Sequence, residues 1–292
     1  MSPTPHVPPI VTSAAPILAR YDVLFCDVWG VVHDGVRAYP QAVDALIRFR
    51  ESGGTVVLLT NAPVPIHRVE AMLEARHVPA DAYDGIVSSG EIALAHIAEA
   101  GYRTAYYIGP RGRDAAFFER SAAGDAPLDA AEAVVCTGLT DDVNETVETY
   151  RDVLARAHAR ALPFVCANPD LVVDVGGRLF LCAGALADAY AHMGGAVFWA
   201  GKPHASAYAT AKAEAERMRK TPVLPEKILV IGDAVRTDLT GAERAGLDAL
   251  FIAGGIHRNE TTTNGALDAA KIAALFQPGT PPALGTMIEL AW

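Results

Sequence analysis

The stretch LFCDVWGVV, Leu24–Val32, decides how the rest of this sequence is interpreted. It predicts a buried apolar strand that ends on a carboxylate, with a turn directly after it. A charged side chain at the end of a hydrophobic strand is costly to bury unless a partner or a function uses it. Asp27 can therefore act as a nucleophile, as a metal ligand or as a cap of the following turn.

The composition is typical of a folded globular protein with about two domains. The chain has 292 residues, of which 51% are hydrophobic and 20% charged, so a sizeable core can form. The formal net charge of −10 argues against a nucleic-acid or anionic-membrane partner, because both require clustered Lys and Arg. An anionic small substrate stays compatible with this charge, since a pocket can be locally positive.

We expect no targeting or anchoring segment. No apolar run reaches about 18 residues, so no transmembrane helix is predicted. Residues 1–17 lack a basic region followed by a long apolar core, so we expect a loosely ordered, proline-rich segment and no signal peptide. The cysteines lie in apolar surroundings without a CxxC pair, which indicates reduced core thiols in a cytoplasmic protein and no zinc site: Cys26, Cys136, Cys166 and Cys182.

Short apolar, β-rich runs alternate with amphipathic helical stretches, a pattern that indicates βαβ units and a parallel sheet. We predict strands at 23–29, 54–60, 104–109, 133–137, 163–167, 227–232 and 249–253. We predict helices between them, at 40–52, 65–76, 90–100, 142–160, 204–219, 236–245 and 268–276. The fold class is therefore α/β.

The chemically suggestive residues fall in two blocks, about 22–65 and 200–260, whereas the middle of the chain has few of them. Such a distribution predicts a domain inserted between two halves of one active-site domain. In an open α/β sheet, sites form at the carboxyl ends of the strands. Asp27, Thr60 and Asp233 all stand at the ends of predicted strands, so one pocket could gather them.

Two shorter motifs each allow a structural and a functional interpretation. Thr60-Asn61 ends a predicted strand, where the hydroxyl could donate to a phosphate oxygen or cap the following helix. In Gly201-Lys202-Pro203-His204, Pro203 fits the first turn of a helix. Lys202 would then lie at the positive end of that helix, where anions gather, unless it is an ordinary surface lysine.

The segment ILVIGD, Ile228–Asp233, is an apolar strand that leads into Gly-Asp, and Asp238 follows five residues later. Two carboxylates near one strand end are expensive to bring together without a cation. Hard oxygen ligands clustered in this way suit Mg²⁺. The pair Asp233 and Asp238 therefore predicts a magnesium site.

The ordered set of strand-Asp, strand-Thr, Lys-Pro before a helix and strand-Gly-Asp resembles the haloacid dehalogenase (HAD) superfamily. The blocks LLTNAP, GKPH and GDAVRTDLTGA are similar to its IIA branch, the NagD-like phosphatases, as are CANPD and VSSG. The form DVWGVVHDG further suggests a bacterial subgroup of that branch. The resemblance implies a three-layer Rossmann-like core with a parallel sheet, formed by residues 18–78 and 199–292. An inserted α/β cap would then occupy residues 79–198.

The resemblance also implies roles for individual residues. Asp27 would be the nucleophile that forms an aspartyl-phosphate, and Thr60 would hydrogen-bond the phosphoryl group. Lys202 would neutralise negative charge, and Asn61 would lie beside these residues in the phosphate pocket. The metal ligands of Mg²⁺ would be carboxylates and one backbone carbonyl, contributed by Asp27, Asp233, Asp238 and Trp29.

Trp29 departs from the family pattern, because phosphatases of this family usually carry Asp there as general acid and base. Tryptophan can do neither, and such help is worth roughly a hundred- to ten-thousand-fold in rate. Three explanations stay open: His33 or Asp34 takes over proton transfer, the substrate has a good leaving group or supplies its own proton, or the protein binds a phosphorylated ligand without efficient turnover. The indole could also stack on a ring of the substrate.

The sequence thus predicts a Mg²⁺-dependent phosphatase that acts on a small phosphorylated metabolite such as a sugar phosphate. The alternative is a catalytically weakened protein that binds such a metabolite or a partner. A dehalogenase needs no metal, so the pair Asp233 and Asp238 counts against it. A homodimer formed through the cap would also fit this branch.

Overall fold

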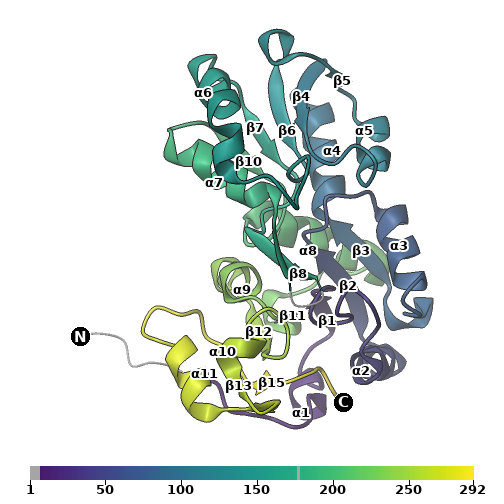
Figure 1. Ribbon diagram of the computed structural model, residues 1–292. Coiled ribbons are helices and arrows are strands. Elements are labelled where there is room, and N and C mark those ends of the chain that lie inside the picture. The colour runs from purple at the N-terminus through teal and green to yellow at the C-terminus, as the bar shows by residue number, and fades with distance from the viewer. Residues whose placement is uncertain (1–6, 176–177) are drawn as a thin grey trace. The chain divides into compact units, whose positions relative to one another are not determined.

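The computed structural model describes residues 7–175 and 178–292. The chain divides into two compact units, which we describe separately. The core unit comprises Met1–Thr60, Ala71–Val87 and Tyr208–Trp292, and the inserted unit comprises Asn61–Glu70 and Ser88–Ala207. The α/β class with an inserted domain is confirmed, since each unit contains its own sheet with helices between the strands (Figure 1).

The core unit is built on a six-stranded sheet with the strand order β15-β12-β11-β1-β2-β3. Its strands are β1 (Val23–Cys26), β2 (Thr55–Thr60), β3 (Gly85–Ser88), β11 (Ile228–Gly232), β12 (Asp248–Ile252) and β15 (Thr286–Met287). All residues of β1, β2 and β11 are buried, as expected for parallel strands covered on both faces. The register pairs Cys26 with both Ile231 and Leu58, so these three strands end at one edge of the sheet.

Helices alternate with these strands along the chain (Figure 1). They are α1 (Ala15–Leu18), α2 (Pro40–Glu51), α9 (Thr240–Ala245), α10 (Arg258–Thr261) and α11 (Ala269–Leu275), with a small β13–β14 pair at Thr262–Thr263 and Ala266–Leu267. Two further helices, α3 (Ile66–Glu74) and α8 (Ala205–Arg219), contain residues of both units. A single π-helical turn, Val235–Leu239, precedes α9 within the predicted helix 236–245. Among the described residues, no helix has both the length and the apolar character that a bilayer span requires.

The inserted unit contains a five-stranded sheet with the order β10-β7-β6-β4-β5. Its strands are β4 (Thr104–Ile108), β5 (Gly124–Asp125), β6 (Ala133–Cys136), β7 (Phe164–Cys166) and β10 (Val197–Trp199), and a separate hairpin is formed by β8 (Val172–Val175) and β9 (Arg178–Leu181). Its helices are α4 (Ser89–Ala100), α5 (Ala115–Arg120), α6 (Arg151–Ala159) and α7 (Ala183–His192). Phe164, Tyr190 and Leu186 lie in its buried core.

Three sequence-based expectations differ from the structure. Strand β3 joins the core sheet, although residues 79–198 were assigned to the insertion. The helix predicted over 142–160 is shorter: Asp141 accepts the N–H groups of Val143 and Asn144 and holds a turn, a 3-10 turn capped by Thr146 follows at Val147–Tyr150, and α6 begins at Arg151. Residues 1–6 lie outside the described residues, but the rest of the predicted loose segment is tied to the C-terminal region. There the Val11 N–H donates to Thr286 O at 2.9 Å and the Ala14 N–H to Ala291 O at 2.8 Å.

Candidate active site

Three carboxylates meet at the carboxyl edge of the core sheet. Asp27 directly follows β1, Asp233 directly follows β11, and Asp238 lies on the π-helical turn after β11. One carboxylate oxygen of each lies within 4.8 Å of the others, and all three residues are buried. The Asp27 N–H donates to Ile231 O at 2.8 Å, which fixes the end of β1 against β11.

Backbone N–H groups orient these carboxylates. The Val28 N–H donates to Asp27 Oδ1 at 2.7 Å, the Ile256 N–H to Asp233 Oδ2 at 2.7 Å, and the Ala234 N–H to Asp238 Oδ2 at 3.1 Å. Hydrogen bonds of this kind favour the ionised form of a carboxylate. These hydrogen bonds thereby fix the directions in which the three carboxylate groups point.

Two glycines make room for the Asp233 carboxylate. A Cβ at Gly30 would lie 2.0 Å from Asp233 Oδ2, and a Cβ at Gly255 would lie 1.9 Å from the same atom. Gly30 also has φ +84°, a conformation that side chains rarely adopt. Sequence reasoning missed Gly255 and the Ile256 N–H, although the pair Gly254-Gly255 directly after a predicted strand was a signal for a close backbone approach.

The donor set fits a hard divalent cation such as Mg²⁺. Such an ion takes oxygen ligands, and three buried carboxylates repel one another unless positive charge lies between them. Asp27, Asp233 and Asp238 would hold the ion, as the sequence predicts. The remaining predicted ligand, the Trp29 carbonyl, belongs to the loop that follows β1.

Thr60 ends β2 and is 7% exposed. Because Leu58 pairs with Cys26 in the parallel register, the side chain lies at the same edge of the sheet as Asp27. The Thr60 hydroxyl thus lies at the end of a strand, as predicted. Its role toward a phosphoryl group stays a prediction.

The indole of Trp29 packs within the loop that follows β1. A Cβ at Gly35 would lie 2.3 Å from Trp29 Cζ2, so the ring covers that glycine directly. The His33 ring meets the indole edge-on, with ring centroids 5.1 Å apart. The loop is held by the Gly30 N–H, which donates to His33 O at 2.8 Å, and by the Arg76 Nε–H, which donates to Gly35 O at 3.0 Å.

His33 does not have the environment of a proton donor. It is 1% exposed, its Nδ1 accepts the Gly35 N–H at 3.0 Å, and its buried Nε2 has no hydrogen-bond partner. Burial is the main cause that lowers the pKa of His33 to about 4, and the charge of the Arg76 guanidinium contributes to the same shift. An imidazole that is neutral at pH 7 cannot give a proton as a general acid, so the structure does not favour the predicted role of this residue.

The Asp34 carboxylate is hydrogen-bonded to the backbone of its own loop. Its Oδ1 accepts the N–H groups of Val36 and Arg37, both at 2.8 Å. Burial alone would raise the pKa of Asp34, but these hydrogen bonds and the Arg37 charge hold it below its usual value. Asp34 is therefore ionised at neutral pH and carries no proton to donate.

The remaining predicted site residues belong to the inserted unit. Lys202 is 2% exposed, and Asn61 is 5% exposed. Asn61 was predicted to bind phosphate, but its side-chain amide contacts the Lys202 backbone, Ser89 and Asp170 instead. Ser89 and Asp170 are the partners that sequence reasoning missed, although the VSSG and NPD motifs marked both segments.

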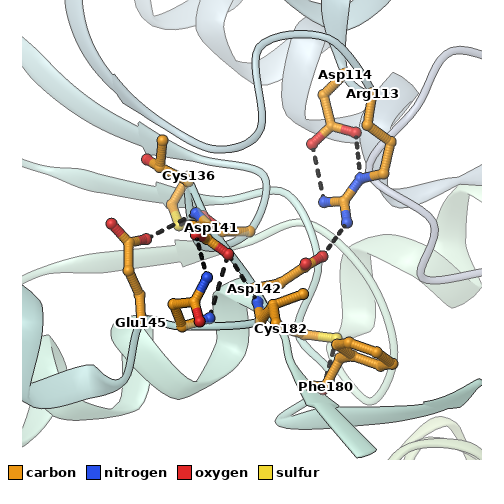
Figure 2. A network of polar contacts seen from close by, with 12 residues as sticks. Arg113, Asp114, Cys136, Asp141, Asp142, Glu145, Phe180 and Cys182 are labelled. Carbon is orange, nitrogen blue, oxygen red and sulfur yellow. Dashed lines mark hydrogen bonds and ion pairs between the residues drawn. The ribbon is translucent and has the colours of Figure 1, made fainter. Parts of the chain in front are cut away.

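A second group of carboxylates (Figure 2) lies in the loops that follow the carboxyl ends of β4 and β6, in the inserted unit. The Arg113 guanidinium contacts both carboxylate oxygens of Asp114 at 2.9 and 3.1 Å and Asp142 Oδ2 at 2.9 Å. Burial raises the pKa of the nearby Cys182 thiol to about 12. This thiol stays protonated, and all four cysteines are buried thiols, as the sequence predicts.

Comparison with known proteins identifies the family. The chain matches the model of haloacid dehalogenase-like hydrolases over residues 24–120 and a HAD-hydrolase-like model over residues 199–276. A solved hydrolase of the haloacid dehalogenase-like family from Brucella suis 1330 is 42% identical, covers 96% of this chain and 100% of its own, and has a TM-score of 0.84. This chain belongs to the haloacid dehalogenase-like family of hydrolases.

More distant structures share the fold. NagD from E. coli K-12 is 19% identical, with 96% of its chain and 92% of this chain covered and a TM-score of 0.65. A glycerol phosphate phosphatase from Mycobacterium tuberculosis, solved in complex with calcium, is 21% identical, with 80% and 90% covered and a TM-score of 0.62. The predicted resemblance to the NagD-like fold is thus confirmed. No curated protein matches this chain.

Proposed function

We propose that this hydrolase is a Mg²⁺-dependent phosphatase that cleaves a small phosphomonoester through an aspartyl-phosphate on Asp27. The observation that carries the proposal is the buried cluster of Asp27, Asp233 and Asp238, whose ligand oxygens lie within 4.8 Å of one another. The calcium complex of the M. tuberculosis glycerol phosphate phosphatase supports a divalent cation in this fold.

In the proposed reaction, an Asp27 oxygen forms a bond to phosphorus while the bond from phosphorus to the leaving oxygen breaks. Water then cleaves the aspartyl-phosphate, which releases phosphate and regenerates the Asp27 carboxylate. When bound, Mg²⁺ supplies positive charge that offsets negative charge on the phosphoryl oxygens. Thr60 would donate a hydrogen bond to the transferred group, and Lys202 would supply a second positive charge.

The proposed reaction must also account for the proton that the leaving oxygen needs. Trp29 has no acidic proton, His33 is neutral, and Asp34 is ionised at neutral pH. We therefore infer that the preferred substrate has a leaving group that departs without full protonation. A sugar phosphate as substrate, a cytoplasmic location and a homodimer through the inserted unit are further parts of this proposal.

The test is phosphate release from aryl and alkyl phosphates of graded leaving-group pKa, with and without Mg²⁺. We expect wild type to release phosphate from nitrophenyl phosphate only with Mg²⁺, and Asp27→Asn to release none. No phosphate release from any substrate in the series would refute the proposal. Halide release that resists a chelator would instead indicate a dehalogenase.

The variant Trp29→Asp separates slow turnover from lost turnover. An acid at position 29 should raise kcat for alkyl phosphates by roughly a hundred- to ten-thousand-fold. It should change kcat for aryl phosphates much less, because their leaving groups need less protonation. Trp29→Phe is the matched control, because it removes the indole without adding an acid. A protein that only binds a phosphorylated ligand would release phosphate in none of these forms.

A further inference from the structure

A buried amide joins three separate segments of the inserted unit. The Asn61 Oδ1 accepts the Lys202 N–H at 2.9 Å and the Ser89 hydroxyl at 3.2 Å. The Asn61 Nδ2 donates to Lys202 O at 3.1 Å and to Asp170 Oδ1 at 2.9 Å. Two donors and two acceptor positions are all that an asparagine amide has, so its hydrogen-bonding capacity is fully used.

Two of these four bonds go to the N–H and the C=O of one residue, Lys202. Both sides of its Cα are thereby held, so the direction in which the Lys202 side chain starts is fixed. We call these hydrogen bonds from Asn61 to the Lys202 backbone the clamp. They can form only because residue 201 is glycine. A Cβ at Gly201 would lie 2.5 Å from Asn61 Oδ1 and 2.0 Å from Ser89 Oγ.

Asp170 and the Lys202 N–H determine which way the amide faces. The Asp170 carboxylate requires a donor, whereas the Lys202 N–H requires an acceptor, so only one orientation of the Asn61 amide satisfies both. Asp170 is itself set by a turn, in which its N–H donates to Asn168 Oδ1 at 3.1 Å. The carboxylate of Asp170 in the NPD segment thus orients the Asn61 amide, and this amide in turn binds the Lys202 backbone.

We propose that Asn61 is a positioning residue that fixes Lys202 for catalysis, and that Asp170 orients the Asn61 amide. This inference rests on the proposed function, in which Lys202 neutralises charge during phosphoryl transfer. Charge neutralisation requires a preorganised cation, and a displacement of about 1 Å can reduce the rate about a hundredfold. Asn61 thus acts on the reaction through Lys202.

The first test needs no turnover. We would measure residue-resolved amide hydrogen exchange by NMR in wild type, Asn61→Ala and Ser88→Ala. Ser88 is the matched control, since it is as buried as Ser89 but contacts Val64 O and the Glu91 N–H instead. The Lys202 amide should exchange at least about tenfold faster in Asn61→Ala and at the wild-type rate in Ser88→Ala.

An unchanged Lys202 amide in folded Asn61→Ala would overturn the proposal. If that variant does not fold, Asn61→Asp keeps the size of the side chain but turns an acceptor toward Asp170. Adding Asp170→Asn to it returns a donor to that contact. In the double variant, the Lys202 amide should exchange at least about threefold more slowly than in Asn61→Asp. An equal exchange rate in the two variants would contradict the proposed orienting role.

The second test asks whether Asn61 acts through Lys202. With nitrophenyl phosphate, Asn61→Ala should lower kcat about 10- to 100-fold and change KM by less than about threefold. In a Lys202→Met background, Asn61→Ala should lower kcat by less than about threefold. An equal loss in both backgrounds would refute the coupling. A wild type without any turnover would refute the proposed function, while the exchange experiment would still decide the clamp.

Discussion

Both sheets of this protein gather carboxylates at the carboxyl ends of parallel strands, but in different ways. In the core unit, Asp27, Asp233 and Asp238 bring like charges within 4.8 Å of one another. In the inserted unit, the Arg113 guanidinium lies between Asp114 and Asp142 and contacts both (Figure 2). One edge concentrates negative charge, and the other neutralises it.

The difference shows what distinguishes a candidate catalytic edge from a structural one. Clustered carboxylates raise the electrostatic energy of the folded chain, and this cost is offset when a cation binds. A guanidinium paired with carboxylates lowers that energy permanently. We therefore expect substitutions at the first edge to change function more than stability, and substitutions at the second edge to do the opposite.

The largest effect is expected from Asp27→Asn. Loss of the nucleophile should lower kcat for phosphate release by at least about 10⁴-fold. Because one of three neighbouring charges is removed, the metal-free variant should melt at the same temperature as wild type or higher. Phosphate assays and thermal unfolding in the presence of a chelator measure both. A large fall in the melting temperature would contradict the assignment of this edge to function.

The opposite pattern is expected from Arg113→Met. Asp114 has no exposed side-chain surface, and its charge would lose the guanidinium that compensates it. The free energy of unfolding should fall by about 2–4 kcal/mol, near the lower range for a broken buried ion pair because Arg113 is half exposed. Arg151→Met is the control. Its ion pair with Glu148 is exposed, so the loss should stay below about 1 kcal/mol.

Activity at saturating substrate should be unchanged in Arg113→Met, measured below its unfolding transition. A loss of kcat without a loss of stability would contradict the structural role of the second edge.

A smaller effect concerns acid stability and His33. The pKa of His33 is about 4 in the folded protein and about 6.5 in the unfolded chain, so protons bind the unfolded chain more tightly. The resulting stabilisation is complete above pH 6.5 and is lost as the pH falls toward 4, by up to about 3 kcal/mol. Urea unfolding of wild type and His33→Asn at pH 7.5 and 4.5 measures it. Asparagine cannot protonate, so the variant should lose less stability than wild type over this interval, and equal losses would refute the burial argument.

The sequence predicts those parts of the site that depend on local pattern. Asp27 and Asp233 follow apolar runs that their alternation with helical stretches identifies as strands, and the parallel register then aligns their ends. The place of β3 in the core sheet and the hydrogen bond from the Val11 N–H to Thr286 O depend on distant partners, which no local pattern identifies. Asn61 is a further case, because its partners Ser89, Asp170 and Lys202 lie 28, 109 and 141 residues away.

The environment of His33 also could not be predicted. The residue follows a turn, where histidines are usually exposed, and a pKa near 6.5 was the reasonable expectation. Its burial depends on the Trp29 indole and on the backbone of the loop that folds over it. The same tryptophan that removes the expected acid also contributes to making the nearest histidine unsuitable as its substitute.

The central claim is that the carboxylates after β1 and β11 hold a divalent cation, and calorimetric titration with Mg²⁺ tests it most directly. Wild type should bind one Mg²⁺, and Asp233→Asn should weaken binding by roughly a hundredfold or more. Asp142→Asn, a carboxylate at the compensated edge, should bind as wild type does. Absence of binding by wild type, or equal binding by wild type and Asp233→Asn, would contradict the account.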